Sequence, residues 1–318
     1  MHSIREAAVS GVFYPSSKLS LSNNVHALLN AAIANIGEAQ VKIKTKTKTK
    51  TKTKNKTNVI TKATAEGETK PQNNFKVASQ HYPKAIIVPH AGYIYSGRTA
   101  AMAYSQLASG RFVIKRVILL GPAHRVTVNG LALPDVEYFA TPLGNVELDQ
   151  NAILLLSRLN QVVVSPAVHA EEHSLEVQLP FLQTVLDDFK LVPLVVGNAS
   201  ADEVAEVLDF LWGGEETLIV ISSDLSHYLP YGFAQQVDLE TVQKILKLEG
   251  GLNHQQACGG TPVNGLILAA KRHQLKPALL DLCNSGDASG DKDRVVGYAS
   301  IAFTASGANE SSTGAHYA

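Results

Sequence analysis

Cysteine is scarce in this chain of 318 residues, which contains only Cys258 and Cys283. Two cysteines do not make a disulfide framework, so a reducing compartment is expected and we predict a cytoplasmic location. The first eight residues contain no long apolar run, which predicts that no secretory signal is present there. No stretch of about 18 apolar residues occurs either, so the sequence predicts no membrane span.

Net charge is absent as well, because 28 basic residues balance 28 acidic ones. The balance is uneven along the chain. The stretch from Lys42 to Lys56 contains eight lysines and no acidic residue. Outside it, the chain has 20 basic residues and all 28 acidic ones. The rest of the protein therefore carries a charge of about −8, which argues against nucleic acid as its partner.

The lysine-rich stretch alternates lysine with threonine and opens a segment, residues 41–80, that is poor in apolar residues. Like charges along one face repel one another, so we predict a disordered insertion at about 41–80 within a single domain that spans residues 1–318. One interpretation of this composition is a surface loop without a function of its own, lengthened by duplication of the Lys-Thr repeat. A basic arm that binds acidic lipid or nucleic acid is the alternative.

From Lys84 onward, short apolar runs alternate with helix-like segments, which is typical of βαβ units. We predict an α/β fold with a mostly parallel central sheet flanked by helices. The predicted strands are Ala85–Val88, Val117–Leu120, Leu191–Val196, Leu218–Ile221 and Val295–Phe303, and the predicted helices are Leu19–Ile36, Thr99–Leu107, Gln150–Leu159, Ser174–Leu186, Asp202–Trp212, Leu239–Leu248 and Pro262–His273.

Three histidines follow predicted strands closely: His90, His124 and His227. Ligands of open α/β sheets bind at the carboxyl ends of the strands, so these imidazoles are expected to converge on one edge. Asp224 precedes His227 by three positions, and one helical turn would place both on the same side. Such a pair can act as general acid and base or can support a metal site, and a helix N-cap is the alternative role for Asp224.

Cys258 stands just before the helix that Pro262 is predicted to open, with Thr261 as its N-cap. Exposed N–H groups and the positive end of a helix favour the thiolate form. A thiolate is a nucleophile or a ligand for a transition metal. The alternative is a small buried residue in a tight turn, and Cys283 is predicted to be structural.

His169, Glu172 and His173 fit the H-x-x-E-H pattern of a zinc peptidase. That pattern requires a helix through both histidines, which Pro166 disfavours. The other interpretation gives His173 and Glu176 catalytic roles in the cleft at the strand ends.

Five ordered motifs resemble the Memo family, also called component B of the AmmeMemoRadiSam system. The similarity extends from Arg5 to the strand at Gly297-Tyr298-Ala299 and omits the Lys/Thr insertion. The motifs are Val88-Pro89-His90-Ala91-Gly92-Tyr93, Leu120-Gly121-Pro122-Ala123-His124, Glu172-His173-Ser174-Leu175-Glu176, Ser222-Ser223-Asp224-Leu225-Ser226-His227 and Cys258-Gly259-Gly260-Thr261-Pro262.

This resemblance implies a fold like that of the catalytic subunits of class III extradiol dioxygenases, which use non-haem iron. It implies metal binding by His90, His124 and Cys258, with Asp224 and His227 in the same pocket. The dioxygenases hold iron with two histidines and a carboxylate, so a thiolate as third ligand points to iron or copper as cofactor.

The resulting expectation is a metal-binding protein and, if it is an enzyme, a dioxygenase-like oxidoreductase acting on a small-molecule ligand. The alternative is a non-catalytic module that binds a peptide or phosphopeptide. The family association also implies radical SAM and AMMECR-type proteins as partners.

Overall fold

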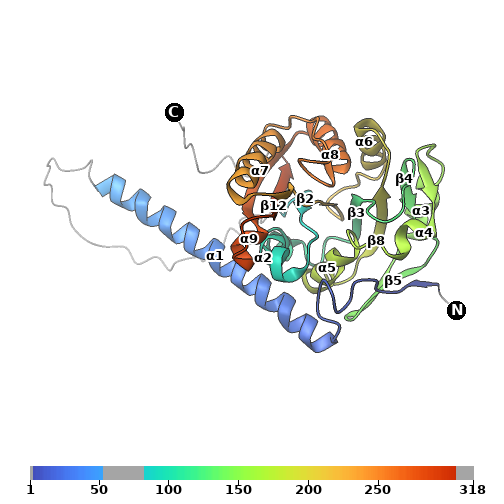
Figure 1. The fold of residues 1–318 in the computed structure, drawn as a ribbon, viewed down its shortest axis with the longest axis horizontal. Coiled ribbons are helices and arrows are strands. Elements are labelled where there is room, and N and C mark those ends of the chain that lie inside the picture. Colours follow the sequence, from blue (N-terminus) through green and yellow to red (C-terminus); the bar gives the residue numbers. More distant parts are fainter. Residues whose placement is uncertain (1–2, 53–81, 306–318) are drawn as a thin grey trace, which may run out of the picture.

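A nine-stranded sheet forms the centre of the protein, for which the computed structural model describes residues 3–52 and 82–305, with side chains for 3–36 and 82–305. The four strands in the middle of this sheet are mutually parallel. Helices lie on both sides of the sheet (Figure 1). This arrangement confirms the predicted α/β fold. In spatial order these strands are β2 (Ala85–Val88), β9 (Thr217–Ser222), β3 (Arg116–Pro122) and β8 (Lys190–Val196).

Antiparallel strands flank the parallel centre. On one side, β12 (Val295–Ala305) pairs with β2 and also with β10 (His227–Leu229) and β11 (Leu275–Asn284). On the other side, β4 (Leu131–Leu133) pairs antiparallel with β8 and parallel with β7 (Val162–Val164). A separate three-stranded sheet consists of β1 (Ile4–Arg5), β5 (Tyr138–Thr141) and β6 (Gly144–Glu147).

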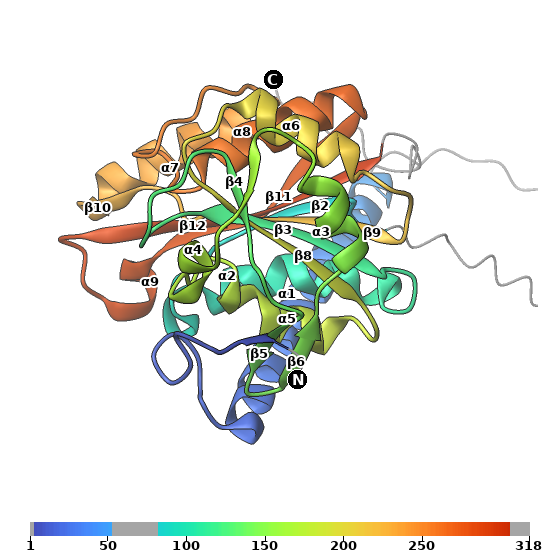
Figure 2. The same cartoon turned by 90° about the vertical axis from the view of Figure 1, so that its right-hand side faces the viewer.

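Helices cover both faces of the large sheet, because each central strand is apolar on both faces. One face carries α1 (Lys18–Lys52), α2 (Tyr93–Tyr104) and α5 (Leu179–Val185), and the other carries α6 (Ala201–Phe210), α7 (Tyr231–Leu246) and α8 (Gly260–Arg272), as Figure 2 shows. Ile86 and Val88 belong to the apolar cluster of the first group of helices, whereas Ala85 and Ile87 belong to that of the second.

Shorter helical pieces complete the described part of the chain. The Asp149 side chain caps the first of them by accepting from the Ala152 N–H at 3.0 Å. The pieces are α3 (Gln150–Leu156), α4 (Pro166–Ala170), α9 (Ser285–Ser289) and the 3₁₀ turns Ser105–Gly110 and Glu176–Gln178.

Two helix starts differ from the prediction. The predicted helix Ser174–Leu186 divides into the 3₁₀ turn Glu176–Gln178 and α5, which places Pro180 in the first turn, where its missing N–H is not needed. The α8 helix begins at Gly260, and Gly259 rather than Thr261 occupies the N-cap position.

The α1 helix is longer than predicted, since its backbone continues past Ile36 to Lys52. Residues 41–52 of the expected disordered insertion are therefore helical. Adding residues to an existing helix costs less than starting one, and lysine is a good helix former, which the strand-like alternation obscured. Figure 1 shows this end of α1 projecting away from the sheet. The rest of the insertion, residues 53–80, lies outside the described residues, and its disorder stays a prediction.

Among the described residues, none of the helices combines the length and the apolar character that crossing a membrane requires.

Candidate metal site

The carboxyl ends of the parallel strands bring the predicted site residues together. His90 follows the end of β2 by two residues, His124 follows β3 by two, and Asp224 follows β9 by two. Because the strands are parallel, these ends lie at one edge of the sheet. The convergence expected from the sequence is therefore present.

A cluster of three imidazoles occupies this edge: His90, His124 and His173. One ring nitrogen from each lies within 4.8 Å of the others, a grouping that can hold a metal ion. The His124 and His173 rings stack with centroids 4.7 Å apart, and His90 meets both edge-on at 5.1 and 5.5 Å. His173 comes from the loop before the turn Glu176–Gln178. The sequence analysis placed His173 in the cleft but did not identify it as part of this cluster.

The hydrogen bonds of His90 fix which nitrogen is free. Ser222 Oγ donates to the carbonyl oxygen of Ser174 at 2.6 Å, and it accepts from Gln178 Nε2 and from His90 Nδ1, each at 2.9 Å. The Nδ1 atom of His90 therefore carries the hydrogen, and Nε2 keeps its lone pair. Burial, with the neighbouring His124 and His173, holds the pKa of His90 well below its ordinary value, so this ring is neutral.

Glu172 orients His124 in the same way. Its Oε1 accepts from His124 Nδ1 at 2.9 Å, and its Oε2 accepts from the His124 backbone N–H at 2.6 Å. Burial raises the pKa of Glu172, but the hydrogen bonds and charge of His124 and the Ser174 N–H outweigh it and lower that pKa to about 2. A carboxylate bound to one ring nitrogen leaves the other nitrogen directed at a metal, which is the usual support of a histidine ligand.

His173 has a buried nitrogen without a partner. Its Nδ1 lies 3.5 Å from Glu172 Oε1 and makes no hydrogen bond within the described part of the chain. Burial lowers the pKa of His173 to about 4, so the ring is neutral, and Phe13 packs on it with centroids 4.8 Å apart. The ring lies against His90 and His124, and one of its nitrogens belongs to the grouping that can hold a metal ion.

Cys258 lies next to the cluster, with its Sγ 3.2 Å from His90 Nε2. The expectation of an easily formed thiolate was wrong. Burial and the nearby charge of Asp224 raise the pKa of Cys258 to about 12, and these effects exceed those of its hydrogen bonds with Asp224, Ser223 and Gly259. A metal ion would be needed to deprotonate this thiol at neutral pH.

Asp224 and His227 lie beside the cluster, but not on a helical turn, because the chain runs extended from β9 into β10. Asp224 accepts from the His90 backbone N–H at 2.7 Å, and burial raises the pKa of Asp224 to about 7. His227 donates from Nδ1 to the Leu225 carbonyl at 2.9 Å, which leaves Nε2 as an acceptor, and burial lowers the pKa of His227.

Glu176 has a different environment from the one expected. This carboxylate is fully buried, pairs with Arg5, and accepts from the Val9 N–H at 3.0 Å and from Tyr14. It is not among the residues that line the pocket described below. Arg5 also donates to the Glu172 carbonyl at 2.7 Å, so the N-terminal segment anchors the loop that carries His173.

The zinc-peptidase interpretation was wrong. The α4 helix ends at Ala170, so His169 and His173 do not share a helix, which that motif requires. His169 is buried, and its Nε2 bonds the Ala132 carbonyl at 2.8 Å. It belongs to the packing under the loop and not to the histidine cluster.

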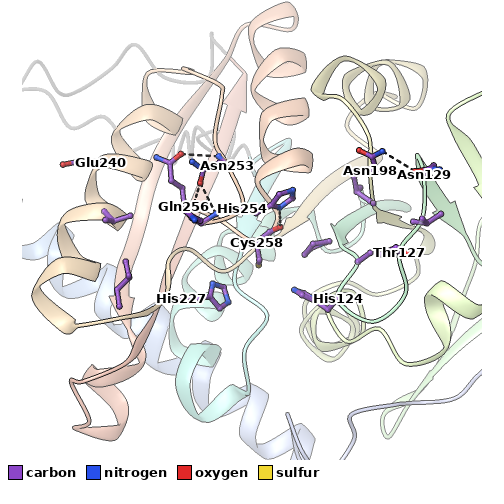
Figure 3. A pocket seen from close by; sticks show the side chains of 18 of the residues that line it. His124, Thr127, Asn129, Asn198, His227, Glu240, Asn253, His254, Gln256 and Cys258 are labelled. Carbon is purple, nitrogen blue, oxygen red and sulfur yellow. Dashed lines mark hydrogen bonds between the residues drawn. The ribbon is translucent and has the colours of Figure 1, made fainter.

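A pocket of about 1120 Å³ opens at the cluster. His124, His227 and Cys258 line one part of it, and the pocket continues past them between α7 and the loops after β3 and β8 (Figure 3). The sequence did not identify this continuation. Its residues come from four separate segments, and the polar run before Cys258 was the one local signal. The members missed include Thr127, Asn129, Asn198, Glu240, Asn253, His254, Gln255 and Gln256.

Fold and site together define an α/β protein with a histidine cluster of metal-binding type at the carboxyl ends of its parallel strands. The family model described as "Memo-like protein" matches residues 50–302, well over half of the chain. The chain belongs to the Memo family.

Curated relatives agree with this assignment. A MEMO1 family protein of Caldivirga maquilingensis is 30% identical over 94% of this chain and 98% of its own length. One from Sulfurisphaera tokodaii is 37% identical over 69% of this chain and 82% of its own. A solved structure of an uncharacterized Escherichia coli K12 protein aligns with a TM-score of 0.40 at 14% identity, over 69% of this chain and 99% of that chain, which is too weak to support an argument.

Proposed function

We propose that this protein binds one redox-active metal ion, iron or copper, and acts as a metal-dependent oxidoreductase. The observation that carries the proposal is the cluster of His90, His124 and His173, whose ring nitrogens lie within 4.8 Å of one another. Burial lowers the pKa of His90 and that of His173, which favours neutral imidazole, the form that binds metals, at these two positions.

Cys258 is the fourth member of the proposed donor set. Two ligands of one tetrahedral ion, at about 2.1 and 2.3 Å from it, lie roughly 3.5 Å apart, close to the 3.2 Å between Cys258 Sγ and His90 Nε2. Imidazole nitrogen suits iron, copper and zinc, and a thiolate shifts the preference toward softer ions such as copper(I). Three nitrogens and one sulfur therefore support iron or copper.

A bound iron or copper ion would supply electron exchange with an oxidant such as dioxygen. The protein's own groups have separate tasks. Asp224 holds the backbone of His90 in place, and Glu172 orients His124. His227 presents a free Nε2 at the pocket, where it can accept a proton from a bound ligand.

The experiment that tests the proposal is metal analysis of anaerobically purified protein after loading with iron(II) or copper(I). We expect about one equivalent of metal in the wild type. Each of His90→Ala, His124→Ala, His173→Ala and Cys258→Ser retains three of the four donors, so each should bind metal more weakly, and the double variants His90→Ala/His124→Ala and His173→Ala/Cys258→Ser should bind none. His26→Ala changes an exposed histidine on α1 and serves as the control.

Absence of bound metal in the wild type under every loading condition would overturn the proposal. Full metal retention in His90→Ala or His124→Ala would overturn the assignment of the ligands.

A further inference from the structure

His227 needs one particular tautomer for the role that the proposed function gives it. It is one of the side chains that line the pocket (Figure 3). Its Nε2 atom can accept a proton only while the ring hydrogen stays on Nδ1. A neutral imidazole carries its hydrogen on either nitrogen, so the partner of Nδ1 decides which tautomer is present.

The partner of His227 Nδ1 is one end of a single peptide group. Nδ1 donates to the Leu225 carbonyl oxygen at 2.9 Å, and the other end of that peptide group is the N–H of Ser226. A peptide group is planar and trans, so its N–H points away from its carbonyl. Whatever binds the Ser226 N–H therefore fixes the direction of the Leu225 carbonyl, and through it the tautomer of His227.

The Ser226 N–H is bound by Asp238, a buried residue of α7 that is 2% exposed. Asp238 Oδ1 accepts from this N–H at 2.9 Å. The second oxygen lies against β12, where a Cβ added to Gly297 would come within 2.0 Å of Asp238 Oδ2. The carboxyl group is thus enclosed between the loop and β12, and position 297 has room only for glycine.

The peptide groups on either side are anchored independently of Asp238. The Leu225 N–H donates to the Gly297 carbonyl at 2.8 Å, and the Gly297 N–H donates to the Ser226 carbonyl at 2.9 Å. These bonds hold the loop on β12, but neither of them involves the Leu225–Ser226 peptide group itself. That group can turn over while its neighbours stay in place.

A turned peptide group would reverse the tautomer. Its N–H would face His227 Nδ1, which would then need a lone pair, so the ring hydrogen would move to Nε2. Its carbonyl would face Asp238. Burial raises the pKa of Asp238 to about 6, so this side chain is a carboxylate at pH 8 and can only accept. Two acceptors do not bond each other, so the carboxylate keeps the observed orientation.

We propose that Asp238 is a positioning residue that sets the tautomer of His227 through the peptide group between Leu225 and Ser226. Asp238 is not among the residues that line the pocket, and it acts on the pocket only through this peptide group. The inference rests on the proposed function for the use of Nε2 as a proton acceptor. The tautomer itself can be measured in the protein without metal.

The test is ¹⁵N NMR spectroscopy at pH 8 of the metal-free full-length protein, labelled in its histidine rings. The chemical shift of each ring nitrogen shows whether it carries the hydrogen, and His227→Gln identifies the signals of His227 by their loss. We expect the hydrogen on Nδ1 in the wild type. Asp238→Ala should lower the fraction with hydrogen on Nδ1 to below about one half. Asp238→Asn keeps an oxygen acceptor for the Ser226 N–H and should retain the wild-type tautomer.

Thr241→Ala is the control for a general loss of stability. It also removes a buried side-chain hydrogen bond on α7, from Thr241 Oγ1 to the Val237 carbonyl at 2.8 Å, but it leaves the loop unchanged. The tautomer of His227 should therefore stay as in the wild type. If Asp238→Ala does not fold, Asp238→Leu takes its place, because it fills the buried space and also lacks the acceptor.

Hydrogen on Nε2 of His227 in the wild type would overturn the proposal. Hydrogen that stays on Nδ1 in a folded variant without the acceptor would overturn it as well. Metal binding is measured on separate samples. The expected tautomers in a protein that binds no metal contradict the proposed function alone, whereas a metal-binding protein with unchanged tautomers in the Asp238 variants contradicts only the role of Asp238.

Discussion

Replacing Glu172 by glutamine removes the carboxylate that orients His124 while it preserves size and shape. In the wild type every group bonded to this carboxylate is a donor: the ring and backbone N–H groups of His124 and the N–H of Ser174. A glutamine presents one oxygen and one NH₂ group. Whichever way it turns, its NH₂ group faces a donor, so at least one buried N–H loses its partner.

The size of the effect follows from these contacts. An unsatisfied buried donor costs about 1–3 kcal/mol of unfolding free energy. Glu172 has its pKa lowered to about 2 in the folded protein, so its carboxylate stabilises the fold fully above about pH 4.5, and this contribution is lost as the pH falls through 2. We therefore expect Glu172→Gln to lower the unfolding free energy by about 2 kcal/mol at pH 7. Metal affinity should fall about 10–100-fold, as for other residues that orient a histidine ligand.

The assay combines a competition titration with a metal chelator and urea unfolding of the metal-free protein. Glu171→Gln is the matched control, because it makes the same change at the exposed neighbouring position and should alter neither quantity. A Glu172→Gln protein with wild-type metal affinity and wild-type stability would refute the role assigned to this carboxylate.

Three other changes test the framework around the site. Arg5→Met leaves the buried Glu176 carboxylate without its cation, so urea unfolding should show a loss of about 3–5 kcal/mol, and a loss below about 1 would contradict the pairing. Burial raises the pKa of Asp238 to about 6, so its carboxyl stabilises the fold when protonated, below about pH 3.8, and this stabilisation is lost as the pH rises through 6. Asp238→Asn should therefore raise the unfolding free energy by about 1–2 kcal/mol at pH 8 and leave it unchanged at pH 3.5. An equal increase at both pH values would contradict this role of Asp238. Gly197→Ala puts a Cβ 2.1 Å from a backbone oxygen of the facing loop, whereas a Cβ at Gly232 meets nothing within 4 Å. Calorimetry should thus show a lower melting temperature for Gly197→Ala, whereas Gly232→Ala should not lower the melting temperature.

Much of the fold was predictable because the central strands are buried on both faces. Continuous apolar runs such as Ala85–Val88 and Leu218–Ile221 identify such strands without any knowledge of their partners. The strand-end rule then located His90, His124 and Asp224 correctly at one edge. The antiparallel strand β11 escaped prediction because it is partly exposed and contains Pro277, which an edge strand tolerates.

The rest of the site depends on contacts between distant segments. Arg5 anchors the loop of His173 from about 170 positions away, and Phe13 packs against the His173 ring. The charge state of Cys258 was mispredicted for a related reason. Its position before α8 is a local feature, but the burial that raises its pKa comes from packing that a sequence pattern does not reveal.

The central claim is that a metal ion lies among His90, His124 and His173. Its most direct test is a crystal of the protein loaded anaerobically with iron(II) or copper(I), with anomalous difference maps measured on both sides of the absorption edge of the metal. We predict a single strong peak about 2.0–2.4 Å from the Nε2 atoms of His90 and His124. A peak elsewhere, or none at this histidine cluster, would contradict the account.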